Sequence, residues 1–287
     1  MGNEAKLHNQ KTREMIKKVA IYTILVIISI IWIFPFIYLI MQSFSKEFND
    51  YSFLPGGGFT FDNYIALFTS TEYPFWRWFL NTLIIASITC VFQTILVLMT
   101  SYAFSRLRFK SRKTLMKFML IIGMFPGFLS MICIYFILDL IGLTGSIFGL
   151  ILVYVAGSAM NYYIAKGFFD TIPKSLDEAA MIDGASKNTV FWKIIMPLSK
   201  PIVVYTILMA FTAPWGDFML ASYIAQGHMD LFNVAVGLQG MLTKGNINQN
   251  FPIFCAGGVV TSIPIVTLFF CLQSYYVEGV TGGAVKG

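Results

Sequence analysis

The residues that could do chemistry are concentrated in one polar stretch, DEAAMIDGASKNTVFWKIIMPLSKP at 177–201. It places acids, lysines, a central glycine and two prolines between long apolar segments. Elsewhere, His8 and His228 lie far apart, the four cysteines lack metal-ligand spacing, and no G-x-S-x-G sequence occurs. No lysine directly follows a glycine, which excludes a Walker A loop. We therefore expect no catalytic site, no metal site and no cofactor bound by this chain.

Long apolar segments must position this stretch. Apolar residues form 57% of the 287 residues and charged residues 12%, and the mean hydropathy is +0.72. In an ordinary soluble domain about a quarter of the residues are charged. The apolar segments have the length of helices rather than of alternating strands, so we expect an all-α, polytopic helical bundle in a lipid bilayer. Six transmembrane helices are predicted, at about 19–42, 81–103, 115–139, 146–165, 201–224 and 252–276.

The basic residues predict how these spans are oriented. Lys and Arg are abundant in the leader 1–18, in the loop 104–117 and along 166–200. The opposite side of the membrane would carry Lys46, Arg77 and Lys244. Because cytoplasmic loops are enriched in Lys and Arg, both termini and the polar stretch are predicted to be cytoplasmic. The net charge of +6 follows this topology, so we expect no nucleic-acid partner.

The predicted spans divide the chain into five parts. These are a cytoplasmic leader (1–18), a first transmembrane helix (19–42), an extracytoplasmic loop (43–80), a transmembrane core (81–276) and a cytoplasmic tail (277–287). The core includes a cytoplasmic loop at 170–201. In the first loop, LPGGGFTFDNY at 54–64 combines glycines with aromatic residues, which favours an ordered loop at the membrane interface.

The polar stretch predicts two short helices joined by a turn. Ser175 and Glu178 have the S-x-x-E spacing of a capping box, Gly184 would supply the turn, and Ser186 would cap the second helix. The second helix carries an apolar stripe, formed by Val190, Phe191, Ile194 and Ile195, that ends at Pro197. A hairpin this short cannot stand free in water. Its apolar face must be buried on a partner protein or on the membrane surface, and the residues alone favour neither.

This pattern resembles the EAA loop of ABC-importer permeases, E-A-A-x-x-D-G-A followed by F-x-x-I-x-x-P. The matching residues are Glu178, Ala179, Ala180, Asp183, Gly184, Ala185, Phe191, Ile194 and Pro197. The resemblance implies that the hairpin couples the permease to an ATPase subunit, which holds it in a cleft. It implies apolar contacts from Ala179, Ala180 and Phe191, and polar contacts from Glu178 and Asp183. Whether Glu178 caps its helix or contacts the ATPase stays open.

The C-terminal VEGVTGGAVKG at 277–287 resembles the end of the smaller permease subunit in carbohydrate importers of the maltose type. There the tail reaches the interface between the ATPase subunits, which implies this position for Gly282, Gly283, Val285, Lys286 and Gly287. FTFDNY, the N-T-L sequence at 81–83 and WGDF at 215–218 are also similar to that family. The loop at 43–80 is short, as in the permease without a large insertion.

The resemblance implies the six-helix, MetI-like fold of type I importers in a bacterial or archaeal plasma membrane. It also implies a heterodimer with a second, homologous permease, two ABC ATPase subunits that bind ATP and Mg, and an extracytoplasmic sugar-binding protein. Translocation would proceed by alternating access, with an oligosaccharide such as a maltodextrin as the expected cargo. The alternatives are an ABC permease for a non-sugar solute, since the EAA loop is widely shared, and an ion-coupled secondary transporter, which would not need a docking hairpin.

Two further sets of residues are candidates for contacts with substrate and binding protein. Asp217 is predicted well inside the fifth span, where a charge is costly, and with Trp215 it could meet a sugar. A structural hydrogen bond at the outer interface is the favoured alternative for Asp217. The resemblance assigns the loop 225–251 to the binding protein's sugar cleft, with Gly237, Gln239 and Gly240 near its tip.

Overall fold

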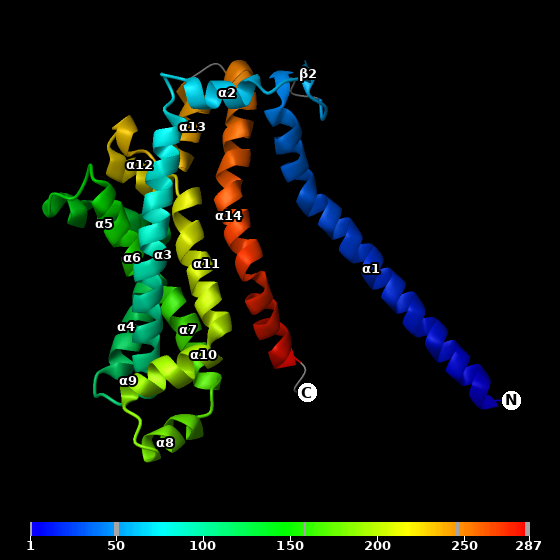
Figure 1. Ribbon diagram of the computed structural model, residues 1–287, viewed down its shortest axis with the longest axis vertical. Helices are drawn as coiled ribbons and strands as arrows, with labels where there is room; N and C mark the ends of the chain where they lie inside the picture. Colours follow the sequence, from blue (N-terminus) through cyan, green and yellow to red (C-terminus); the bar gives the residue numbers. More distant parts are fainter. Residues whose placement is uncertain (1, 49–51, 158, 245–246, 285–287) are drawn as a thin grey trace. The chain divides into compact units, whose positions relative to one another are not determined.

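The computed structural model describes residues 2–48, 52–157, 159–244 and 247–284. Helices dominate the described residues, and the sheet among them has two strands (Figure 1). The chain divides into two compact units, which are described in turn. The first comprises Met1–Leu67 and Gly245–Val259, and the second comprises Phe68–Lys244 and Val260–Gly287.

The first unit begins with a long apolar helix, α1 (Gly2–Ser43). The helix already starts at Gly2, so the described residues of the predicted leader are helical. A short antiparallel hairpin follows, formed by β1 (Ser45–Glu47) and β2 (Gly56–Phe59). Helix α2 (Asp62–Thr69) closes the loop.

Side-chain contacts order the loop after α1. Phe44 stacks on Phe59 with ring centroids 5.1 Å apart. The Asn63 amide donates to the carbonyls of Ser43 and Ser45, at 2.9 and 2.7 Å. These contacts satisfy polar groups that the turn leaves free. The prediction of an ordered loop at 54–64 is confirmed for the described residues.

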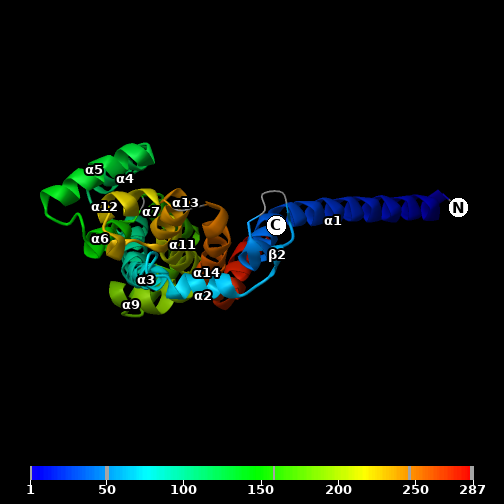
Figure 2. The same ribbon diagram turned by 90° about the horizontal axis from the view of Figure 1, so that it is seen from above.

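Helix α3 (Phe75–Arg106) is the centre of the second unit. It packs against α6 (Ile147–Ala156), α7 (Ala159–Thr171) and α11 (Lys200–Gly216), and these helices lie side by side with it in both views (Figures 1 and 2). Leu107 adopts an extended backbone and ends α3 at the point where the basic loop begins. The helix therefore places Arg106 at the base of the bundle.

Two predicted spans are broken. The segment 115–139 forms α4 (Arg112–Gly123) and α5 (Gly127–Leu140), which meet at 105°. Pro126 lies in the break, because proline lacks an N–H donor and disfavours helical backbone in the residue before it. The segment 201–224 is divided into α11 and α12 (Met219–Ala225), with Asp217 and Phe218 between them. At both places one transmembrane helix was predicted, and the structure has two helices joined by a bend or break.

In the described residues, four helices are long and apolar enough to cross a membrane. The number reaches six if each of two bent helix pairs forms one span. The last is α14 (Ile247–Ala284), whose residues contribute to both units. Its candidate span is Asn250–Tyr275, close to the predicted 252–276.

Candidate functional site

The polar stretch forms the predicted hairpin. Helix α8 (Ser175–Ile182) leads into a turn, and the second arm follows as α9 (Lys187–Thr189), a π-helical segment (Val190–Ile195) and α10 (Met196–Leu198). At the turn, Gly184 has φ +87°, a conformation that side chains with a Cβ rarely adopt. The N–H of Ala185 donates to the Ala180 carbonyl at 2.9 Å, which closes the end of α8. The turn prediction for Gly184 is confirmed.

Only one of the two predicted caps forms. Ser186 has an extended backbone, and its hydroxyl accepts a hydrogen bond from the Thr189 N–H at 3.2 Å. Ser175 is instead the first residue of α8, and Lys174 before it is already helical, with no side-chain cap. Because Ser175 lacks the extended backbone of a cap, the capping box is wrong. Glu178 is exposed, and it does not take part in a cap.

The second arm is buried by its own chain. Val190, Phe191 and Ile195 belong to a core cluster with residues of α3 and α7, and the Phe191 side chain is 5% exposed. The rings of Phe191 and Tyr102 lie 4.7 Å apart. An ATPase contact by Phe191 is thus the wrong expectation, because this ring anchors the hairpin to the bundle. The stripe needs neither a partner nor a membrane surface to cover it.

The second arm also differs from its predicted end. The helix runs through Pro197 to Leu198, and the chain bends by 84° at Ser199. Pro197 occupies the first turn of α10, where its missing N–H is tolerated. Ile194 is half-buried and Pro197 is exposed.

The first arm, α8, presents an uncovered face. Leu176, Met181 and Ile182 are exposed, and 85% of Ile182 is accessible. Ala179 and Asp183 are also exposed, whereas Ala180 and Ala185 are half-buried. Figure 1 shows α8 at the end of the second unit opposite α12. This arm therefore supplies the apolar surface that a docking partner would cover.

A buried ion pair joins α8 to the end of α3. Arg106 Nε lies 2.9 Å from Asp177 Oδ2, and the two side chains are 5% and 11% exposed. Arg106 Nη2 also donates to the Ile172 carbonyl at 2.7 Å. Neither Arg106 Nε nor Asp177 Oδ1 has an aligned hydrogen bond, so charge rather than geometry holds this contact.

Burial raises the pKa of Asp177, although the positive charge of Arg106 lowers it in part. The negative charge of Glu178 raises this pKa further, and Lys174 opposes it. Loss of water around the carboxylate thus outweighs the attraction of its partner. Sequence reasoning missed this pair, because Arg106 and Asp177 are far apart in the sequence and no local pattern links them. The available signals were an arginine at the end of a span and an acid directly before the E-A-A motif.

The structure gives Asp217 a structural role. It lies in the break after α11 rather than inside a span, so that prediction is wrong. The Tyr154 hydroxyl donates to Asp217 Oδ2 at 2.5 Å, and the Leu220 N–H donates to Oδ1 at 3.1 Å. Asn233 donates to the Asp217 carbonyl at 2.7 Å. Since both carboxylate oxygens accept hydrogen bonds from the chain, the structural interpretation is confirmed.

Trp215 is not available for stacking on a sugar. Its side chain is 4% exposed and packs edge-on against Phe79, with centroids 5.5 Å apart. A sugar ring needs an open indole face. The expected role of Trp215 in a substrate path is therefore wrong for this conformation.

The predicted binding-protein loop contains a packed helix. Gly237, Gln239 and Gly240 lie in α13 (Val234–Lys244), and an added Cβ on Gly237 would fall 2.0 Å from the Trp78 ring. Gly237 therefore permits close packing on α3 and is not at a loop tip. Gln239 is exposed, but it belongs to the same helix.

The tail is described only in part. Helix α14 continues through Gly282 and Gly283, although the last span was predicted to end at 276. Val285, Lys286 and Gly287 lie outside the described residues. Their expected place at an ATPase interface stays a prediction.

The second unit thus combines apolar helices with a hairpin whose second arm is packed against them. Residues 97–282 match the family described as the binding-protein-dependent transport system inner membrane component, and the chain belongs to that family. It is a transport subunit of an ABC importer and not an enzyme.

Curated relatives match over the whole chain. The chain is 37% identical to the maltodextrin transport system permease protein MalD of Streptococcus pneumoniae, covering 100% of both proteins. It is 35% identical to the galactooligosaccharides transport system permease protein GanQ of Bacillus subtilis, covering 98% of this chain and 100% of that protein.

A solved structure shares the fold. It belongs to a bacterial ABC transporter that imports the acidic polysaccharide alginate, with a TM-score of 0.76 and 22% identity. The match covers 92% of this chain and 97% of that one. The expected MetI-like, all-α fold is confirmed.

Proposed function

We propose that this chain is one of two permease subunits of an ATP-driven importer that carries neutral oligosaccharides of the maltodextrin or galactooligosaccharide type. The two curated relatives support the substrate class, because both are named for oligosaccharide transport. The remaining subunits would be a homologous permease, two ATPases that bind ATP and Mg, and an extracytoplasmic sugar-binding protein. The hairpin and both termini would face the cytoplasm, in line with the basic loops.

The observation that carries the coupling role is the asymmetry of the hairpin. Its second arm is fixed in the core through Phe191, while α8 exposes Leu176 and Ile182. A partner that binds α8 would therefore also move the helices on which the second arm packs, α3 and α7. We infer that Glu178 and Asp183, both exposed, contribute polar contacts beside this apolar face.

Two contacts would transmit the movement to α3. The Arg106–Asp177 ion pair ties α3 to α8, and the packing of Phe191 on Tyr102 ties it to the second arm. When ATP binding closes the ATPase dimer, the hairpins would be drawn together and α3 would tilt with them. Such a rigid-body movement between two packings is the general basis of alternating access.

The substrate assignment is tested with the complete assembly in nanodiscs. Purified binding proteins loaded with maltodextrins, galactooligosaccharides or amino acids are added, and ATP hydrolysis is measured. We expect stimulation by an oligosaccharide-loaded binding protein. Stimulation by amino acids alone would refute the sugar assignment and leave the transport family intact.

The coupling assignment is tested with two equally exposed residues. Ile182 lies on α8 and is 85% exposed, while Leu140 ends α5 and is 87% exposed. We expect Ile182→Ser to reduce ATPase retention during purification at least several-fold, and Leu140→Ser to leave it unchanged. Equal retention in both variants would refute docking through α8.

A further inference from the structure

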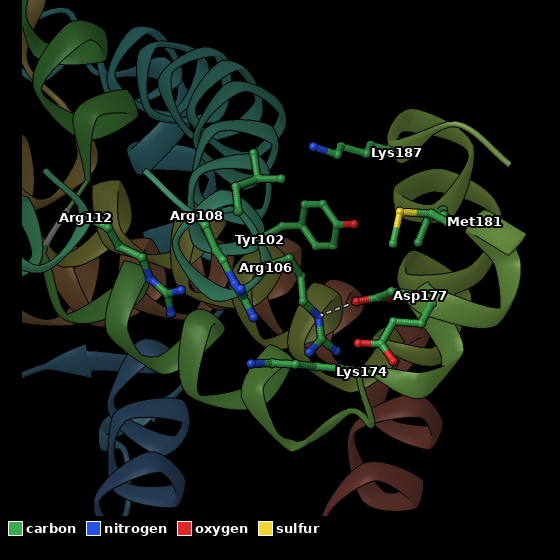
Figure 3. A pocket seen from close by; sticks show the side chains of 11 residues that line it. Tyr102, Arg106, Arg108, Arg112, Lys174, Asp177, Met181 and Lys187 are labelled. Carbon is green, nitrogen blue, oxygen red and sulfur yellow. Dashed lines mark ion pairs between the residues drawn. The ribbon is translucent and has the colours of Figure 1, made fainter. Parts of the chain in front are cut away.

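A cationic cleft lies beside α8. The Arg106–Asp177 pair at its wall belongs to the proposed coupling path, whereas its other cationic side chains have no role there. Its volume is about 340 Å³, and it lies between the end of α3, the loop that leads to α4, and the hairpin (Figure 3). Five cationic side chains line it: Arg106, Arg108, Arg112, Lys174 and Lys187. In the view of Figure 3, Arg108 and Lys174 are drawn near the Arg106 guanidinium, and Lys187 is drawn apart from it, beyond Tyr102.

The positive charge of this cleft is not balanced by its own acids. Asp177 and Glu178 are the two carboxylates in its lining, so the five cations leave an excess of three positive charges. Of the two ion pairs found in the described residues, the one in this cleft joins Arg106 to Asp177. A further carboxylate, Asp170, interacts with Arg112 through its charge, but it pairs with Lys166 and does not line the cleft. Like charges gathered around one cleft repel one another, and an anion would relieve the repulsion.

Arg106 also has unused hydrogen-bonding capacity. Its side chain is 5% exposed, yet Nη1 has no hydrogen-bond partner, and the contact of Nε with Asp177 lacks hydrogen-bond alignment. A buried guanidinium donor without an acceptor is costly. A ligand with several oxygen acceptors would satisfy it, because the guanidinium fork matches phosphate geometry.

We propose that this cleft binds a phosphate-type anion. The candidate span Phe75–Arg106 ends at the cleft, so an anionic lipid headgroup could reach it from the membrane surface. Free phosphate offers the same oxygens without an acyl chain. The recognition chemistry is shared: Arg106 supplies the buried donor, and Arg108 and Lys187 supply charge at the rim.

The test uses the full-length chain in nanodiscs of phosphatidylcholine, with or without phosphatidylglycerol. Retained phosphatidylglycerol is counted by native mass spectrometry, and binding of inorganic phosphate is titrated in pure phosphatidylcholine discs. The variants are Arg108→Gln and Lys187→Gln. Lys110→Gln is the matched control, because Lys110 lies in the same basic loop and is exposed but does not line the cleft.

We expect Arg108→Gln and Lys187→Gln each to weaken anion binding about tenfold, as for the loss of one charge-assisted hydrogen bond. Lys110→Gln should bind like the unmodified chain. Retention of phosphatidylglycerol without phosphate binding identifies a lipid headgroup site. Phosphate binding with the same dependence on the variants identifies a free-anion site. The proposal is overturned if neither anion binds, or if all three variants behave alike.

This proposal does not depend on the sugar assignment. If the chain binds no anion, ATP hydrolysis should still be stimulated by the oligosaccharide-loaded binding protein. If no oligosaccharide stimulates hydrolysis, the cleft should still bind the anion. Double substitution of Arg108 and Lys187 provides a second check, since both are rim residues and Arg106 stays in place.

Discussion

The two arms of the hairpin are both rich in apolar residues but have opposite environments. Val190, Phe191 and Ile195 of the second arm are buried in the bundle, whereas Leu176 and Ile182 of α8 are exposed. This difference in burial indicates that the two arms of the hairpin have separate roles. The second arm fixes the hairpin to the chain, and the first is left for another molecule.

The comparison also explains why a short hairpin is stable here. The buried arm supplies the hydrophobic contacts that a hairpin cannot provide for itself. The ion pair between Arg106 and Asp177 then fixes α8 without covering its outer face. Substitutions in the two arms should therefore separate stability from partner binding.

Removal of the buried ring should have the largest effect. We expect Phe191→Ala to lower the free energy of unfolding by about 3–5 kcal/mol, the usual cost of deleting a buried aromatic side chain. Phe191→Leu should recover most of this loss, because it keeps an apolar side chain of comparable bulk. Unfolding is measured for the chain in detergent micelles. A loss below about 1 kcal/mol for Phe191→Ala would mean that the second arm is not an anchor.

Loss of Arg106 should be nearly as severe and should depend on pH. Arg106→Gln leaves the Asp177 carboxylate buried without its cation, which costs about 3 kcal/mol at neutral pH. The pKa of Asp177 is already raised by burial, and Arg106 is the main group that lowers it. In the Arg106→Gln variant, the pKa of Asp177 should therefore be raised further.

The sign of the pH effect follows from that shift. A raised pKa means that the folded chain binds the proton more tightly, so stability is gained below the folded pKa and lost as pH rises through it. The defect of Arg106→Gln should accordingly shrink as the pH is lowered towards the acidic range. Thermal unfolding from neutral to acidic pH measures this loss of stability. The double variant Arg106→Gln/Asp177→Asn is the control. A defect that does not change with pH would contradict this account.

The sequence predicted the hairpin well because its signals are local. The positive φ of Gly184 and the cap at Ser186 depend on neighbouring residues, and both are confirmed. The Ser175 cap failed because the helix starts at Ser175, one residue earlier than the S-x-x-E spacing indicates, and the Leu176 N–H already bonds to the Pro173 carbonyl. A capping pattern does not say where the backbone first becomes helical.

Long-range packing was not accessible in the same way. Hydropathy marks apolar segments but not the bend at Pro126 or the break at Asp217, so each of the two segments was predicted as one transmembrane helix. The family resemblance placed Gly237 near a loop tip. In the structure this residue lies in a helix, and it must be small because the Trp78 ring approaches closely.

A milder strain should appear at the turn between the arms. Gly184→Ala forces a side chain into positive φ and should cost about 1–2 kcal/mol, with no clash, because no atom lies within 4 Å of the added Cβ. Gly167→Ala is the matched control. It also has open space but lies inside α7, where alanine is the better helix former. Equal stability of the two variants would show that the turn tolerates other conformations.

The smallest effect on stability is expected at the exposed face of α8. Ile182→Ser should change the free energy of unfolding by less than about 0.5 kcal/mol, because 85% of this side chain is in solvent. It should nonetheless lose ATPase association, whereas Phe191→Leu should keep it. Measured together in the same nanodiscs, the two variants separate anchoring from docking. If Ile182→Ser destabilised the chain as much as Phe191→Ala, the two arms would not have the separate roles that their burial indicates.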